Sequence, residues 1–153
     1  MKIRRPFQKR TATNKRRRAA ALVEMAMVLP IFVTVTLGIV EFGRAMMVAQ
    51  LVTNAAREGA RLGSLDGTVN SEVEQTVRDF LVTATSVAPG DINVVITVTP
   101  AAGNPNPNNQ IVSAQVRDQV NVRVEVPFNK VSFVSGSYLT GSNLVGDATM
   151  RHE

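Results

Sequence analysis

The sequence of 153 residues lacks cysteine and tryptophan, and it contains one histidine, His152, and one tyrosine, Tyr138. The absence of cysteine excludes a disulfide framework, a thiolate nucleophile and a cysteine–zinc site. A lone histidine is too few for a two-His metal site and argues against a His-based catalytic triad. The scarcity of large aromatic side chains argues against a stacking platform for single-stranded nucleic acid.

Acidic residues are absent from residues 1–18, which contain nine of the 17 Lys and Arg side chains. In the rest of the chain the acids outnumber the bases, so the net charge of +5 describes a basic tail and not a basic domain. Such a tail can bind nucleic acid, or it can mark the cytoplasmic side of a membrane span. Nucleic-acid binding leaves the apolar run that follows the tail unexplained, so the sequence favours the membrane.

Residues 19–40 form a long apolar run with one charge, Glu24, and one proline, Pro30. As a helix this run is roughly 33 Å long, about the thickness of the hydrocarbon core of a bilayer. A buried core helix needs a larger protein around it, and a cleavable secretory signal has a shorter apolar segment of about 7–15 residues. The run therefore predicts a single-pass transmembrane helix in the cytoplasmic (inner) membrane, with residues 1–18 as a cytoplasmic leader and the C-terminal domain outside.

Residues 41–65 are expected to continue the helix as an amphipathic segment, because polar side chains recur there at helical spacing. Ala55, Gly59 and Gly63 form a row of small residues four positions apart. Such a row lets another backbone approach closely. It is expected to pack either against the protein's own sheet or against a helix of another chain in an assembly. The helix is expected to end at Gly63.

Residues 66–153 are predicted to form an exterior domain that begins with a second, short helix. Ser71 and Glu74 match a capping box at its start, and the Pro89-Gly90 pair is expected to stop it. Apolar residues follow the capping box at helical spacing: Val73, Val77, Phe80 and Leu81.

The remainder of this domain is predicted to form strands. Residues 101–110 are rich in Pro and Asn and are expected to be a connector or a partner-binding tip. The expected fold is α+β, with a long N-terminal helix, a short helix and a three- to four-stranded antiparallel sheet. The strand segments show apolar alternation: residues 94–99, residues 116–126 and, interrupted by Gly141 and Gly146, roughly Leu139–Met150.

Three segments carry a family resemblance. The basic tail and apolar run read RRRAAALVEMAMVLPIF, the continuing helix reads IVEFGRAMMVAQLVTNAAREGARLGS, and the last residues read GDATMRHE. The pattern resembles the TadE-like proteins, the minor pseudopilins of tight-adherence pilus systems. Those proteins have a basic leader, then a small residue, a glutamate and a long apolar helix. The resemblance implies a pilin-like fold.

The resemblance also implies processing. In that family a membrane prepilin peptidase cuts the leader on the cytoplasmic side, and the glutamate is the fifth residue of the mature protein. Carried over to Glu24, this implies a cut between Ala19 and Ala20, although the family usually has glycine where this sequence has Ala19. After a cut, the new amine of Ala20 is expected to pair with Glu24 of a neighbouring subunit. Without a cut the protein is an uncleaved anchor, and Glu24 can snorkel to the headgroups.

No motif for catalysis, phosphate binding or metal binding occurs, and the scattered carboxylates of residues 66–153 are expected to be solvated. The sequence therefore predicts a protein that is not an enzyme and has no cofactor, metal, nucleic acid or small-molecule substrate. The leading hypothesis is a pseudopilin-like structural component of a tight-adherence type IV-like pilus or related secretion assembly. Its expected partners are the membrane, other pilus or pseudopilin subunits and a prepilin peptidase, with a cell-surface pilus as a further location. The alternative is an uncleaved, membrane-anchored binding module that presents its exterior α+β domain.

Overall fold

The computed structural model describes residues 10–132 and 141–153. The chain divides into two compact units, residues 1–39 and residues 40–153. One helix, α1 (Arg10–Gly63), supplies the described part of the first unit and also enters the second. The second unit adds another helix and a three-stranded antiparallel sheet, which confirms the α+β fold predicted from the sequence.

α1 begins earlier than the apolar run. Its first residue is Arg10, whereas the sequence suggested a start near Ala19. Lys and Arg are good helix formers, and neither glycine nor proline interrupts residues 10–18. The basic segment therefore extends the helix. α1 continues through Pro30 and ends at Gly63, as predicted.

The sheet has the strand order β1–β2–β3. Its central strand places Val122 opposite Ile96 on one side and opposite Ala148 on the other. Buried and exposed residues alternate along the first two strands, so the sheet has one apolar face. The strands are β1 (Asn93–Thr99), β2 (Gln119–Pro127) and β3 (Asn143–Arg151).

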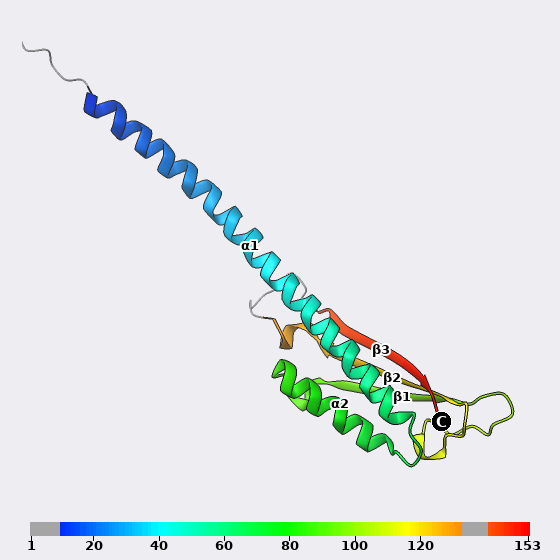
Figure 1. Ribbon diagram of the computed structural model, residues 1–153. Helices are drawn as coiled ribbons and strands as arrows, with labels where there is room; N and C mark the ends of the chain where they lie inside the picture. Colours follow the sequence, from blue (N-terminus) through cyan, green and yellow to red (C-terminus); the bar gives the residue numbers. More distant parts are fainter. Residues whose placement is uncertain (1–9, 133–140) are drawn as a thin grey trace, which may run out of the picture. The chain divides into compact units, whose positions relative to one another are not determined.

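Two helices cover the apolar face of the sheet. The second half of α1 and α2 (Asn70–Thr85) lie side by side over it (Figure 1). Three short 3-10 helices lie between the other elements, at Pro89–Asp91, Ile111–Ser113 and Phe128–Lys130. The buried core includes Val48, Val52, Ala55, Ala56 and Ala60 from α1, Val73, Val77 and Leu81 from α2, and Val94, Ile96, Val98, Val120, Val122, Val124 and Val126 from the sheet.

The start of α2 differs from the sequence prediction, and the capping box at Ser71 is wrong. The residue before the helix is Val69, which makes no side-chain capping hydrogen bond. Asn70 instead ties the helix start to a distant loop. Its Oδ1 accepts a hydrogen bond from the Ile111 N–H, and its Nδ2 donates to the Asn109 carbonyl, both at 2.8 Å. A long-range contact therefore sets the beginning of this helix.

The end of α2 also comes earlier than predicted. The helix stops at Thr85, because Ser86 has a left-handed φ of 60° and its N–H bonds the Val82 carbonyl at 2.9 Å. Pro89 therefore does not end it. Phe80, which was expected on the apolar face, is 40% exposed.

The central strand is shorter than the alternation suggested. β2 begins at Gln119, and Val116 is exposed outside it. Arg117 lies between them with a φ of 81°, which an extended strand does not allow. The alternation of apolar and polar residues in the sequence therefore begins before the strand does, on the N-terminal side of the turn at Arg117.

The last strand begins at Asn143, and the start predicted at Leu139 lies outside the described residues. Gly141 precedes the strand with a φ of 84°. Gly146 lies within the strand and does not interrupt it. The sequence prediction of an interruption at Gly146 is therefore wrong.

Candidate functional site

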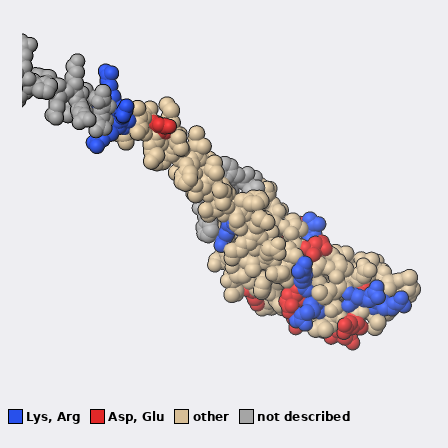
Figure 2. Space-filling view, turned by 45° about the horizontal axis from the view of Figure 1, so that its top comes forward, with Lys and Arg blue, Asp and Glu red and all other residues tan. Residues whose placement is uncertain are grey.

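An apolar surface extends along the first unit. α1 contains an 18-residue window of mean hydropathy 2.2, and none of that window is buried. Its large apolar side chains, such as Leu22, Ile31 and Phe32, are exposed. Figure 2 shows this stretch as tan atoms that follow a blue cluster of Lys and Arg. By length and composition α1 is a candidate membrane span.

The residues predicted to act in processing and assembly lie on this span. Ala19, Ala20 and Glu24 are all exposed. Ala20 and Glu24 are four residues apart, so they share one face of the helix. The predicted cleavage position lies within a helical turn and not in an extended segment.

The row of small residues lies inside the second unit. Ala55, Gly59 and Gly63 are buried there. A Cβ placed on Gly59 would lie 2.7 Å from Val77 Cγ2 in α2, and one on Gly63 would lie 3.1 Å from Val120 Cγ1 in β2. The row therefore brings α1 close to the protein's own helix and sheet.

Sequence reasoning missed Glu41, which is only 1% exposed although it directly follows the apolar run. Ser132 Oγ donates a hydrogen bond to Glu41 Oε1. One turn later, Arg44 Nε donates to the Val131 carbonyl at 3.2 Å. These contacts hold the first turn of the second unit against the segment that follows β2. An acid and a base three positions apart resemble an ordinary solvated helix face, so this pattern does not indicate burial.

Asp118 was expected to be solvated, and that expectation is wrong, because its side chain is fully buried. Its Oδ2 accepts a hydrogen bond from the Gln115 N–H, and its Oδ1 accepts from the Ala101 N–H and from Asn104 Nδ2. The distances are 2.8, 2.8 and 2.6 Å. Burial by itself raises the pKa of Asp118, but these hydrogen bonds and the nearby His152 together hold it below its usual value.

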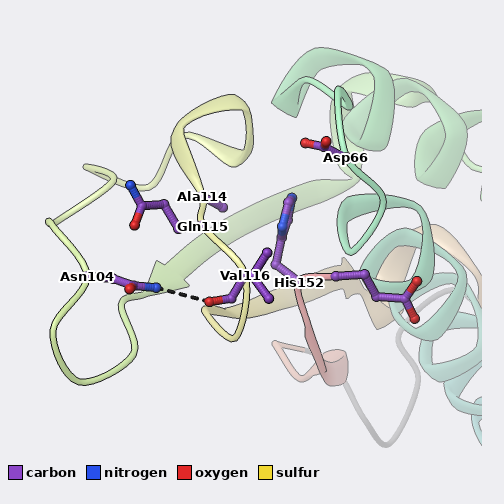
Figure 3. A pocket seen from close by; sticks show the side chains of 7 residues that line it. Asp66, Asn104, Ala114, Gln115, Val116 and His152 are labelled. Atoms are coloured by element: carbon purple, nitrogen blue, oxygen red, sulfur yellow. Dashed lines mark hydrogen bonds between the residues drawn. The ribbon is translucent and has the colours of Figure 1, made fainter.

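A pocket of about 380 Å³ lies close to this buried carboxylate. His152 is only 3% exposed, and its Nδ1 has no hydrogen-bond partner within the described structure. Figure 3 shows its imidazole between Asp66 and the loop of Gln115 and Val116. In residues 10–132 and 141–153, no group of three His, Cys, Asp or Glu side chains could hold a metal ion. The pocket is lined by Asp66, Asn104, Ala114, Gln115, Val116, His152 and Glu153.

Comparison with protein families matches residues 19–61 to the TadE-like protein family. The resemblance inferred from the sequence is confirmed over this segment, which includes Ala19, Ala20, Glu24, Glu41 and Arg44. The match covers fewer than half of the residues and ends before the sheet. No curated protein and no solved structure matches the chain significantly. Together with the candidate span, the match suggests a membrane-anchored component associated with tight-adherence pili, which is a structural and not an enzymatic context.

Proposed function

We propose that this protein is a pseudopilin-like structural component of a tight-adherence type IV-like pilus or related secretion assembly. One observation carries the proposal: the TadE-like match and the uncovered apolar helix coincide in a single segment of the chain. Apolar surface costs about 25 cal/mol per Å² in water. A helix this apolar is therefore stabilised in lipid, or in the shared helical core of a filament.

The charge distribution supports an orientation in the cytoplasmic membrane. Lys15 and the three arginines at residues 16–18 are exposed on α1 directly before the span. Basic residues beside a span remain on the cytoplasmic side. The second unit, residues 40–153, is then outside. Protease added to spheroplasts should degrade the second unit and spare the leader.

Glu24 is the residue on which the assembly mechanism depends. A carboxylate in hydrocarbon costs a few kcal/mol unless it pairs or snorkels. A cut between Ala19 and Ala20 would create a positive amine, and the amine of a neighbouring subunit is a suitable partner for Glu24. The N-terminal amine of each newly added subunit would neutralise the Glu24 carboxylate of a neighbouring subunit. The protein would therefore act by assembly and not by turnover.

Replacement of Glu24 tests this mechanism. Glu24→Gln keeps the shape of the side chain and removes its charge, so we expect normal membrane insertion and loss of co-purification with other pilus subunits. Glu72→Gln is the matched control, because Glu72 is exposed on α2, away from the span. Equal co-purification of wild type and Glu24→Gln would contradict the proposal.

A second candidate function rests on Ala19, which stands where the family usually has glycine. An uncleaved protein would be a permanent anchor that presents the second unit as a binding module. Mass spectrometry of the membrane-bound protein distinguishes the two functions. In cells that contain a prepilin peptidase, the pseudopilin predicts loss of residues 1–19, whereas the anchored module predicts the full-length chain.

A further inference from the structure

The pocket beside His152 belongs to the second unit and has no part in the proposed assembly mechanism. It forms where three segments meet: the turn after α1, the loop before β2 and the residues after β3. Three backbone hydrogen bonds hold these segments together, and in one of them the Arg117 N–H donates to the His152 carbonyl at 3.0 Å. The His152 N–H donates to the Asp118 carbonyl at 2.8 Å, and the Glu153 N–H donates to the Ser64 carbonyl at 3.1 Å. The walls of the pocket are therefore held by the folded backbone.

The buried imidazole indicates that this pocket accommodates a polar group. His152 lines the pocket, and its buried Nδ1 has no hydrogen-bond partner in the described part of the chain. A buried polar atom that lacks a partner costs free energy. The side chain lies between Asp66 and the Gln115–Val116 loop, which also line the pocket (Figure 3). The volume of about 380 Å³ is many times the roughly 30 Å³ of one water molecule.

The chemistry of the lining identifies the class of ligand. Most of the lining side chains are polar, whereas sites for small organic molecules are predominantly apolar. Asp66 and Glu153 contribute two carboxylates, and neither Lys nor Arg is among the described residues that line the pocket. Carboxylates and a neutral imidazole nitrogen accept hydrogen bonds. The described side chains form no group that could hold a metal ion, so the matching ligand is an organic cation that donates hydrogen bonds.

We propose that this pocket binds the guanidinium or ammonium group of an Arg or Lys side chain from a partner polypeptide. His152 Nδ1 accepts one hydrogen bond from the cation, and Asp66 and Glu153 balance its charge. A guanidinium carries five donors in a planar fork, which suits acceptors on several sides. The volume is at the small end of the range of about 300–1,000 Å³ for ligand cavities, so a side-chain head group fits better than a whole metabolite.

The single histidine provides a direct measurement, because its imidazole resonances need no further assignment in full-length protein containing labelled histidine. The protein in nanodiscs would be titrated with N-acetyl-argininamide and with N-acetyl-citrullinamide, which has a similar shape without the charge. We expect a saturable shift of the His152 resonances with the arginine probe. The citrulline probe should bind at least about tenfold more weakly, because charge-assisted hydrogen bonds are roughly twice as strong as neutral ones.

Two variants distinguish binding of the arginine probe in the pocket from a general effect of the protein's charge. Asp66→Asn should weaken binding of the arginine probe by about tenfold. Asp79→Asn removes an exposed carboxylate of α2 that does not line the pocket, so it should leave the affinity unchanged. An unchanged His152 spectrum would mean that the pocket holds only water, and equal shifts with both probes would mean that charge is not recognised. Either result overturns the proposal.

A further titration with a peptide tests whether the bound cation belongs to a polypeptide. The capped tripeptide Gly-Arg-Gly should bind at least as tightly as N-acetyl-argininamide if the natural ligand is part of a polypeptide. Exclusion of the tripeptide while the small probe binds would overturn the assignment to a partner polypeptide.

Discussion

A Cβ placed on Gly146 in β3 would lie 2.6 Å from both the carbonyl carbon and the carbonyl oxygen of Val52 in α1. Real Cβ atoms essentially never approach another heavy atom within 3.0 Å. The backbones of helix and strand therefore meet at this point, and glycine is required for the contact. The position that looked like an interruption of the last strand is where α1 lies directly on the sheet.

Gly146→Ala should destabilise the second unit by about 1–3 kcal/mol or more, the usual cost of overpacking. Since the obstacle is backbone, adding Val52→Ala should not restore stability. Pulse proteolysis of the full-length protein across a urea series measures the free energy of unfolding. Gly43→Ala is the matched control. Gly43 lies in α1 with open space around it, so that change should be neutral or should stabilise by up to about 1 kcal/mol. A Gly146→Ala protein as stable as wild type would contradict the described contact.

Gly59→Ala should also destabilise the second unit, but here a second substitution can relieve the clash. The new methyl group would lie 2.7 Å from Cγ2 of Val77, which is a side-chain atom. Val77→Ala removes that atom and by itself leaves a cavity. The double variant should therefore be more stable than the sum of the single changes predicts, by about 0.5–3 kcal/mol of coupling. A urea series for the four proteins measures this coupling, and strict additivity would show that the two residues do not interfere.

The buried Asp118 makes stability depend on pH in a defined direction. Its pKa is lowered in the folded protein, so its contribution is fully present above the unfolded pKa of about 3.9 and is lost as the pH falls through the folded value. In Asp118→Asn an amide NH₂ replaces one acceptor, which should cost about 1–3 kcal/mol at neutral pH. The variant should lose less stability than wild type between neutral pH and the acid range.

Urea midpoints at a series of pH values test this prediction. Asp79→Asn serves as the control, because that exposed carboxylate should leave the pH profile close to that of wild type. Parallel profiles for wild type and Asp118→Asn would show that the buried carboxylate does not carry the effect.

Ala19→Gly should increase the fraction of processed protein if the residue before the cut limits cleavage. The change restores the residue that the family usually has there. Mass spectrometry of membrane-bound protein from cells with a prepilin peptidase measures the two forms. Ala26→Gly is the control, because it causes the same loss of helix propensity, about 1 kcal/mol, at a position away from the predicted cut. Equal processing of all three proteins would show that Ala19 does not limit cleavage.

Features governed by local periodicity could be predicted from the sequence. Val94, Ile96 and Val98 alternate with polar or exposed neighbours, and this segment forms β1 with those three residues buried. The apolar run, the amphipathic segment after it and the glycine at position 63 likewise predicted the course of α1 after its basic start, and its end. In each case the order of apolar and polar residues within one segment determines which side chains are buried, so the prediction needs no information about distant residues.

Features set by distant partners could not be predicted. The start of α2 depends on Asn70 bonding Ile111, which lies 41 residues away in the sequence. The start of β2 depends on the turn around Asp118, whose carboxylate accepts a hydrogen bond from the Ala101 N–H 17 residues away. The candidate pocket is a further case, because three distant segments form it and His152 alone gave no signal.

The helix that carries the candidate span also contributes Val48, Val52, Ala55, Ala56 and Ala60 to the core of the second unit. A fragment that starts at Asp66 would keep α2 but would expose the part of the valine face that α1 covers, which would make the fragment prone to aggregate. A cut that releases the second unit as a folded domain must therefore fall before Ala45, the first residue of α1 in that core.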